Sequence, residues 1–173
     1  GDSLKRIREE HSEVAAKYPR FITEYSRDQI TIPKIEAHPL RPWQEELNAT
    51  LNKEPEDRKI IFLVDQLGNK GKTWFSKYYS LLHENSQILE SGKKQDMAHA
   101  LRQDVRVLFV NCTRQSVEYL QYGFLESVKD GLVFSSKYES GMKYMPPCHV
   151  VVTMNCHPDM CALSNDRYDV RVL

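Results

Sequence analysis

A short glycine-containing loop between a buried strand and a helix constrains this chain more than any other feature. Residues 59–64 (KIIFLV) form a continuous apolar run, which is typical of a strand covered on both faces. Residues 65–71 contain two glycines, and residues 72–82 have the pattern of a helix. A strand, a glycine-containing turn and a helix in this order predict an α/β unit whose loop can enclose an anion.

The loop carries most of the phosphate-binding pattern G-x-x-x-x-G-K-[ST], ending in residues 71–73 (GKT). Its backbone N–H groups can surround phosphate oxygens, Lys72 can reach the β- and γ-phosphates, and the Thr73 hydroxyl can hold Mg²⁺. The pattern requires glycine at position 66, where this chain has Gln66, and we expect Gly68 to supply the tight turn instead. We therefore predict that ATP and Mg²⁺ bind here. The expected nucleotide contacts are Gly68, Asn69, Lys70, Gly71, Lys72, Thr73 and Trp74.

The rest of the chain alternates apolar runs with helical patterns. Further strands are predicted at 105–110 (VRVLFV) and 149–154 (HVVVTM), helices near 93–101 and 117–129, and a hairpin within 131–144. Alternating buried strands and helices predict an α/β fold with a mainly parallel sheet. We place this core at residues 53–173.

Residues 1–52 are predicted to form a small helical segment before the core. An exposed helix is expected at 3–17, a loop-rich passage at 18–40, and a second helix beginning at Pro42. Trp43, Leu47 and Leu51 lie on one face of that second helix. This stripe suits either contact between subunits or packing on the chain's own core.

Composition excludes some classes of protein. Lys+Arg and Asp+Glu number 24 each among 173 residues, so the formal net charge is zero and bulk positive charge cannot hold nucleic acid. A local basic surface is still compatible with this sum. No run of about 18 apolar residues indicates a membrane span. The leading Gly1 indicates a piece of a longer protein.

The cysteines indicate a reducing, intracellular compartment, because four in 173 residues are few for a disulfide scaffold. Cys148, Cys156 and Cys161 cluster with two histidines, so a zinc site has to be weighed. The cluster contains no C-x-x-C pair, and plain reduced thiols are the favoured interpretation.

Hydrolysis of a nucleotide needs a carboxylate at the end of a strand next to the phosphate loop. The strand 105–110 is followed by Asn111, and Asp104 lies at its opposite end. The strand 149–154 is followed by Asn155, whose amide could orient a water or bind the γ-phosphate. The alternative for Asn155 is a simple turn at the strand end, since Pro158 follows shortly.

Four segments together resemble the superfamily 3 helicase domain of viral replication-initiator (Rep) proteins, particularly those of circular single-stranded DNA viruses of the nanovirus and circovirus type. The similarity extends from about Pro42 to the C-terminus. It implies a P-loop NTPase fold, an AAA+-like three-layer sandwich, in an ATP-dependent helicase. It also implies a homo-oligomeric ring, hexameric by analogy, that translocates on single-stranded DNA in the host nucleus. The four segments are 65–74 (DQLGNKGKTW), 116–140 (SVEYLQYGFLESVKDGLVFSSKYES), 149–159 (HVVVTMNCHPD) and 163–167 (LSNDR).

The resemblance assigns roles to individual residues. Lys72 and Thr73 resemble the Walker A lysine and hydroxyl, and Asn155 resembles the polar sensor of motif C. Arg167 resembles the arginine that reaches a neighbouring subunit's γ-phosphate; the alternative is an ordinary surface arginine paired with Asp166 or Asp169. Lys137 resembles the hairpin lysine that grips DNA in the ring's channel. Lys129 and Lys143 are further candidate DNA contacts.

The chain departs from this family at Asn111, where relatives usually have the Walker B aspartate of Phe-Asp-x-x-Arg. An asparagine can bond a metal-bound water but brings no charge, so we expect nucleotide binding with slow hydrolysis. Glu126, an acid in the matched segments, could compensate, although a solvated carboxylate is the alternative.

Two other functions compete with the ATP-driven motor. A nucleotide-gated module that assembles or binds DNA without hydrolysis is favoured by Asn111. An unrelated nucleotide kinase is disfavoured, because there is no Arg-rich insertion typical of a lid. The relatives' nicking domain needs a His-hydrophobic-His pair, which the six histidines do not form, so we expect this chain not to cut or join DNA.

Overall fold

The computed structural model describes residues 38–138 and 140–173, and these fall into two compact units. The larger unit is formed by Leu40–Lys72 and Asn85–Leu173. The smaller unit includes Thr73–Glu84, which is most of helix α5 (Lys72–Leu82). The predicted helix 3–17 and nearly all of the loop-rich passage 18–40 lie outside the described residues.

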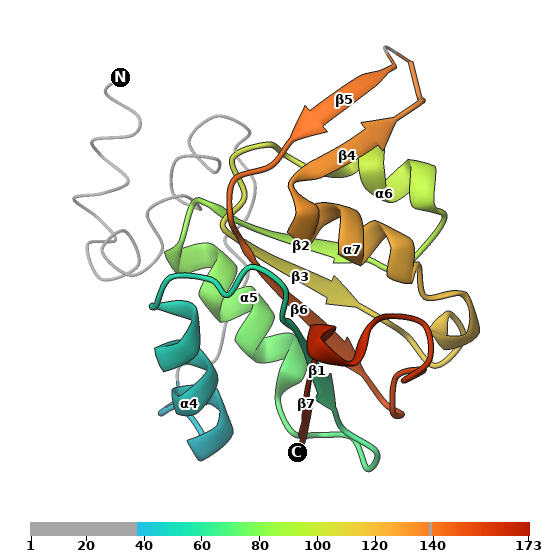
Figure 1. The fold of residues 1–173 in the computed structure, drawn as a ribbon. Helices are drawn as coiled ribbons and strands as arrows, with labels where there is room; N and C mark the ends of the chain where they lie inside the picture. Colours follow the sequence, from blue (N-terminus) through green and yellow to red (C-terminus); the bar gives the residue numbers. More distant parts are fainter. Residues whose placement is uncertain (1–37, 139) are drawn as a thin grey trace, which may run out of the picture. The chain divides into compact units, whose positions relative to one another are not determined.

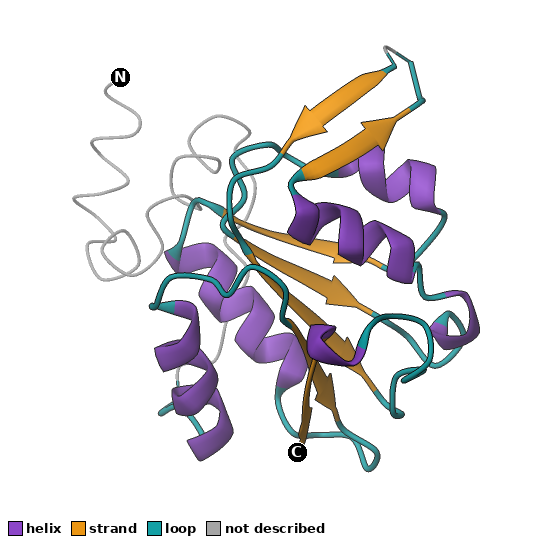
Figure 2. Cartoon of the chain, in the orientation of Figure 1, coloured by secondary structure: helices purple, strands orange, loops and turns teal. Residues whose placement is uncertain are grey.

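A five-stranded sheet forms the centre of the larger unit (Figures 1 and 2). Its strand order is β2-β3-β6-β1-β7, and every neighbouring pair is parallel. β1 and β6 are buried along their whole length, and their side chains are apolar on both faces except for His149 and Thr153 of β6. The α/β fold with a parallel sheet is therefore confirmed. The strands are β1 (Ile60–Val64), β2 (Ser86–Glu90), β3 (Val107–Asn111), β6 (His149–Met154) and β7 (Tyr168–Val172).

Helices and a hairpin complete the larger unit. α6 (Lys94–Ala100) contacts β2, and α7 (Tyr122–Asp130) contacts β6. The antiparallel hairpin of β4 (Leu132–Ser135) and β5 (Gly141–Tyr144) lies beside both helices, as Figure 1 shows. Short 3₁₀ turns occupy Val117–Tyr119 and Asn165–Arg167, and α4 (Pro42–Leu51) precedes the sheet. The fully buried apolar core includes Phe62, Leu108, Phe124, Leu125 and Val152.

In the smaller unit, aromatic side chains along α5 stack on one another. The rings of Trp74 and Tyr78 stack with centroids 4.9 Å apart, and the ring of His38 stacks on Trp74 at 3.7 Å. One turn further along, Tyr79 and His83 stack at 4.0 Å. The Trp74–Tyr78 and Tyr79–His83 pairs are each four positions apart, which is the spacing that brings side chains together on one face of a helix.

Most of the predicted elements are confirmed, with three differences in the sheet and in one helix. β2 and β7 were not predicted, because as the outer strands they are only half-buried and carry polar side chains. The expected helix 117–129 is instead a 3₁₀ turn followed by α7, which ends at Gly131 in a left-handed conformation (φ +83°). Within the described residues, no helix has the length and apolar character needed to cross a membrane.

Candidate functional site

The loop that follows β1 is tightly curled around the side chain of Asp65. This carboxylate is fully buried and accepts hydrogen bonds from the backbone N–H groups of Gly68 (2.7 Å) and Lys70 (3.2 Å). Gly68, Asn69 and Gly71 all have positive φ, at 84°, 61° and 86°. Because L side chains rarely adopt this region, glycine is favoured at such positions. Gly68 takes part in the tight turn, as expected from the absence of glycine at position 66.

Lys72 begins α5 directly after this loop, and its side chain turns toward the end of β6. Its Nζ lies 3.0 Å from Asn155 Oδ1, 3.2 Å from the carbonyl oxygen of Met154 and 3.8 Å from Asp65 Oδ2. The structure thus brings together Lys72 and Asn155, two of the residues predicted for the site. Burial lowers the pKa of Lys72; the Asp65 carboxylate opposes that shift, and the positive charge of Arg114 adds to it.

Asn111 ends β3 at the same carboxyl edge of the sheet. It pairs in register with Thr153 of β6, and its Oδ1 accepts a hydrogen bond from the Thr153 hydroxyl at 3.2 Å. The position predicted to correspond to Walker B therefore holds a neutral amide that is hydrogen-bonded within the sheet. Glu126, the acid considered as a substitute, belongs to α7 and lies 3.7 Å from the Nε of Arg167.

Arg167 is buried, with 4% of its surface exposed, and pairs within its own chain. Its Nη2 donates to Asp130 at 2.9 Å, while Nη1 has no hydrogen-bond partner among the described residues. The alternative pairing with Asp166 or Asp169 is wrong, since those carboxylates pair with Arg58 and Arg171. A contact from Arg167 to a neighbouring subunit stays a prediction, and this position would require the pair with Asp130 to open.

Lys137 lies in the turn between β4 and β5, as predicted for a DNA-gripping residue. Its ammonium forms an ion pair with Asp96 of α6, and both side chains are about half exposed. An exposed pair of this kind contributes little to stability, so it can open readily for another anion. Its position is compatible with the predicted role.

The other two candidate DNA contacts have internal partners. The Nζ of Lys129 donates to the carbonyl oxygens of Glu56 (2.6 Å) and Cys148 (2.7 Å). The Nζ of Lys143 donates to three carbonyl oxygens of residues 98–101, at 2.7, 2.8 and 2.7 Å. These ammonium groups satisfy backbone carbonyls of loops and of the end of α6, so a DNA-binding role for Lys129 and Lys143 is not supported by where they lie.

The first turn of α4 contacts the outer side of the loop, which sequence reasoning missed. Arg41, Trp43 and Gln44 donate from their side chains to the carbonyl oxygens of residues 69, 70 and 71, at 3.1, 3.0 and 3.3 Å. The partners are 27 or 28 positions apart, and no local sequence signal reports such a contact. For Asp65 a signal exists: an acidic residue directly after a buried strand can bond a backbone N–H within the following turn.

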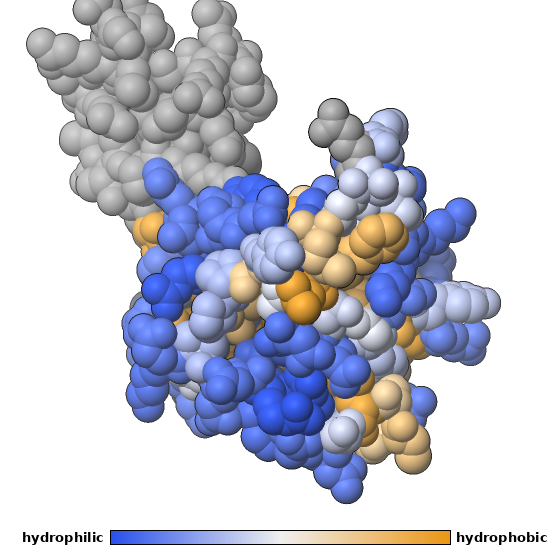
Figure 3. Space-filling model, turned by 45° about the horizontal axis from the view of Figure 1, so that its top comes forward, coloured by the Kyte–Doolittle hydropathy of each residue, from blue (hydrophilic) through white to orange (hydrophobic). Residues whose placement is uncertain are grey.

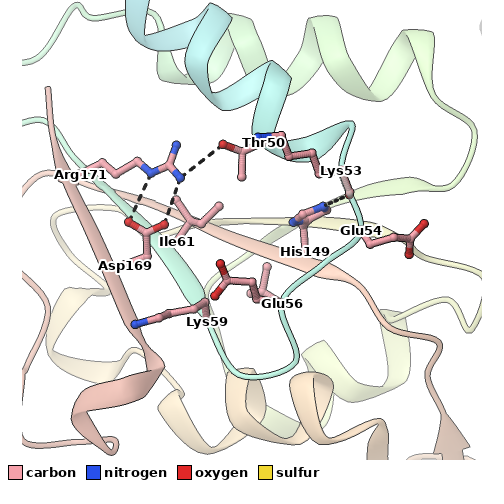
Figure 4. A pocket seen from close by; sticks show the side chains of 10 residues that line it. Thr50, Lys53, Glu54, Glu56, Lys59, Ile61, His149, Asp169 and Arg171 are labelled. Atoms are coloured by element: carbon pink, nitrogen blue, oxygen red, sulfur yellow. Dashed lines mark hydrogen bonds and ion pairs between the residues drawn. The ribbon is translucent and has the colours of Figure 1, made fainter.

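A cavity of about 220 Å³ opens at the opposite, amino edge of the sheet (Figure 4). Its charged lining is largely paired: Arg171 bonds Asp169 and Thr50, and the ring of His149 bonds the carbonyl oxygen of Lys53 at 2.9 Å. Ligands of open α/β sheets bind outside the carboxyl ends of the strands, so this cavity is not the candidate nucleotide site.

Two of the predicted ligand contacts belong to the smaller unit. Thr73, the expected Mg²⁺ ligand, directly follows Lys72 in the chain, and Trp74 stacks on His38 and Tyr78. In the described part of the chain, no group of three His, Cys, Asp or Glu side chains could hold a metal ion. Mg²⁺ at phosphate sites is usually held by one or two protein groups together with substrate phosphates, so the predicted Thr73 ligation does not need such a group.

Comparison with known proteins identifies relatives of the chain, although no family model matches it. It is 39% identical over 131 residues to Para-Rep C6 of Subterranean clover stunt C6 alphasatellite, a match of 74% of this chain and 46% of that protein. It is 35% identical over 144 residues to Para-Rep C7 of Faba bean necrotic yellows C7 alphasatellite, covering 76% and 47%. It is 34% identical over 127 residues to the master replication protein of Milk vetch dwarf virus (isolate N), covering 73% and 43%.

The chain thus spans about half the length of the curated relatives it matches. Among solved structures, the apo C-terminal region of NrS-1 matches with a TM-score of 0.48 and 12% sequence identity, over 74% of this chain and 33% of that one.

Proposed function

Since this chain is homologous to the Para-Rep and master replication proteins of nanoviruses and their alphasatellites, we propose that it is the ATP-binding domain of a viral replication protein. One observation carries the proposal: the curled loop after β1 places Lys72 within 3.0 Å of Asn155, at the carboxyl edge of a parallel sheet. A lysine, a polar strand end and a glycine-containing loop at that edge are the parts a triphosphate site requires.

In the proposed complex, different groups of the chain bind different parts of the nucleotide. The backbone N–H groups of Gly71 and Lys72, where the loop meets α5, would donate to phosphate oxygens, because the start of a helix favours an anion; those of Gly68 and Lys70 bond Asp65. Lys72 exchanges its contacts with Asn155 and Met154 for the terminal phosphates, and Arg114 adds positive charge nearby. The Thr73 hydroxyl would be the ligand from this chain for a bound Mg²⁺, which would supply neutralisation of phosphate charge.

A titration of the chain with a fluorescent ATP analogue and Mg²⁺ tests the binding step. Saturable binding is expected, and Lys72→Ala should weaken it strongly because the cation at the terminal phosphates is lost. Lys77→Ala is the matched control, since Lys77 is an exposed lysine of the same helix. Absence of saturable binding, or equal affinity for Lys72→Ala and the native chain, would contradict the proposal.

The further proposal is a motor: several copies form a ring, hydrolyse ATP and move on single-stranded DNA through hairpins that carry Lys137. It is supported by the replication-protein relatives and by the place of Lys137 in the turn between β4 and β5. Contacts of this kind are mainly to phosphates and depend on salt. Measured mass with an ATP analogue and an oligonucleotide should rise to that of a ring. A strictly monomeric complex, or DNA affinity unchanged by Lys137→Ala, would count against the motor.

A second candidate is a nucleotide-gated module without hydrolysis, and Asn111 favours it. The amide at the end of β3 is bonded to Thr153 and provides no charge for the Mg²⁺ shell. A phosphate-release assay with and without single-stranded DNA separates the two candidates. Negligible release by the native chain together with rapid release by Asn111→Asp would favour the module, whereas equal and rapid release by both would exclude it.

A further inference from the structure

The first turn of α4 contacts the phosphate loop at three successive carbonyl oxygens. Arg41 Nη1 donates to residue 69, Trp43 Nε1 to residue 70 and Gln44 Nε2 to residue 71, over 3.1, 3.0 and 3.3 Å. One turn of a helix therefore faces one side of the loop, and each of its three polar side chains bonds one peptide group of that loop.

Peptide geometry links this outer face of the loop to its inner face. In a trans peptide the carbonyl oxygen of one residue and the N–H of the next point in opposite directions. A carbonyl of residue 69, 70 or 71 held toward α4 thus turns the N–H of residue 70, 71 or 72 away from α4. The N–H of Lys70 confirms the direction, because it bonds the buried carboxylate of Asp65 on the other side.

Gln44 is the member of this set with the least freedom. Its side chain is fully buried, and its Oε1 accepts a hydrogen bond from the backbone N–H of Arg41 at 2.9 Å. With the oxygen engaged there, the NH₂ group faces the carbonyl of Gly71. A Cβ atom at Gly71 would lie only 2.9 Å from that nitrogen, so α4 and the loop are in close contact at this point.

We propose that Arg41, Trp43 and Gln44 are positioning residues, which hold the loop with the N–H of Lys70 on Asp65 and the N–H groups of Gly71 and Lys72 turned toward the phosphates. The first turn of α4 thereby sets the affinity of the chain for the phosphate groups of its nucleotide. This inference rests on the proposed function, because it assigns a support to the same site. It also makes α4 part of the nucleotide site rather than part of an independent N-terminal segment.

The main test is the double variant Arg41→Met/Trp43→Phe in the full chain. It removes two donors and keeps much of the apolar bulk, while Gln44 stays in place. Two hydrogen bonds of ordinary net strength predict an affinity for Mg²⁺–ATP that is about tenfold weaker. The affinity for inorganic tripolyphosphate should fall by the same factor, because the loop contacts phosphates and not the base. Glu45→Gln is the matched control, since Glu45 is exposed in the same turn of α4.

Further measurements separate positioning from folding and from the proposed function. Unchanged melting with weaker phosphate binding supports the inference, and so does recovery of affinity in Arg41→Lys/Trp43→Phe. The single variant Trp43→Phe, with an expected loss of about threefold, serves if the double variant does not fold. If the native chain binds ATP and the variants bind both probes equally well, the inference is wrong and the proposed function stands.

If the native chain binds no ATP, the proposed function fails, and hydrogen exchange of the loop then tests the support alone. Without nucleotide, peptides covering residues 68–72 should exchange faster in the double variant than in Glu45→Gln. Equal exchange in both variants would overturn the inference.

Discussion

Gly71 and Gly68 offer a paired test of the loop, because both have φ near +85° but only Gly71 is in close contact with another element. In Gly68→Ala no atom lies within 4 Å of the added Cβ. The free energy of unfolding should therefore fall by about 1 to 2 kcal/mol, from backbone strain alone. Gly71→Ala adds a close contact between the new Cβ and Gln44, so its free energy of unfolding should fall by about 1 kcal/mol more. Denaturant unfolding of both variants measures the difference, and equal losses would show that the contact with Gln44 relaxes without cost.

Asp65 is the acid that organises the loop, and the prediction is that its charge cannot be replaced by an amide. Asp65→Asn keeps the size of the side chain but faces one backbone N–H with an NH₂ group instead of an oxygen. The free energy of unfolding should fall by about 1 to 3 kcal/mol, because a buried N–H loses a charged acceptor. Nucleotide affinity should fall with it.

Asp166→Asn is the control for Asp65→Asn, since Asp166 pairs with Arg58 at the surface and its loss should change the free energy of unfolding much less. Equal unfolding free energies for both variants, measured in denaturant, would contradict the role of Asp65.

Single residues of the site could be predicted from the sequence where their signal is local. Lys72 follows a recognisable loop, and Asn155 follows a buried strand, so each is found without knowledge of the fold. Parallel pairing of β1 and β6 then brings them together. Gln44 and Trp43 could not be found this way, because their contacts with the loop depend on how α4 packs. The same limit applies to Lys143, because a positive charge in a hairpin indicates DNA as readily as a bond to α6.

Helices and strands, like single residues, could be predicted where their signal is local and not where they depend on packing. β1, β6 and α5 were predicted because continuous apolar runs and helical spacing are visible in the sequence alone. β2 and β7 are outer strands whose alternating polar residues resemble loops, and they become strands through pairing with β3 and β1. These two strands extend the three predicted ones to a five-stranded sheet.

Lys143 stabilises the contact between two elements, the hairpin and α6. The last carbonyl groups of a helix have no intrahelical partner, and a cation nearby also interacts favourably with the helix dipole. Lys143→Met removes three donated hydrogen bonds and should lower the free energy of unfolding by about 1 to 3 kcal/mol. Lys137→Met, in the same hairpin, should lower the free energy of unfolding much less, because its ion pair is exposed.

DNA binding should distinguish the same two variants in the opposite order. Affinity for a single-stranded oligonucleotide is expected to fall for Lys137→Met and to remain for Lys143→Met. A fall for Lys143→Met without loss of stability would restore that lysine as a DNA contact.

The start of β6 should make stability sensitive to acid. Burial lowers the pKa of His149 from 6.5, against a smaller opposing effect of the bond to the Lys53 carbonyl. The folded state therefore favours the neutral ring, and the stability is fully present above the unfolded pKa. Below about pH 6.5 the unfolded chain takes up the proton first, so unfolding becomes easier by at most about 1.4 kcal/mol per pH unit.

Unfolding measured in denaturant between pH 8 and pH 5 checks this expectation, and His149→Gln should flatten the slope. His83, whose pKa burial also lowers, should retain its own share of the slope in that variant. A slope unchanged by His149→Gln would assign the acid sensitivity to other groups.

At the scale of the whole molecule, positive and negative charge balance, and several lysines of the described residues bond backbone groups. Positive and negative residues number 24 each, and Lys129 and Lys143 bond backbone carbonyls. On the face shown in Figure 3, hydrophilic side chains surround separate hydrophobic patches. One face of the hairpin adds exposed apolar side chains, among them Phe134 and Tyr144. The proposed DNA binding is therefore expected to depend on several copies acting together, each supplying few cations.

The reactivity of the four cysteine thiols should show whether the larger unit is folded. Cys112 and Cys148 are buried near opposite edges of the sheet, after β3 and before β6, whereas Cys156 and Cys161 are exposed. Burial raises the pKa of Cys148 to about 11, so that thiol is protonated at pH 8 and unreactive as a nucleophile. A disulfide reagent at pH 8 should therefore modify two thiols rapidly and two only as the chain unfolds.

The slow phase of that reaction should accelerate with denaturant in parallel with global unfolding, because access to Cys112 and Cys148 requires the sheet to open. Cys156→Ser and Cys161→Ser identify the fast thiols, each removing one rapid equivalent and leaving the slow phase in place. If the cysteines are plain thiols, a metal chelator should change neither phase. Zinc bound by Cys148, Cys156 and Cys161 would slow the fast phase, and a chelator would then restore the fast rate by removing the zinc. Four rapidly reacting thiols in the native chain would contradict the arrangement of the strands itself.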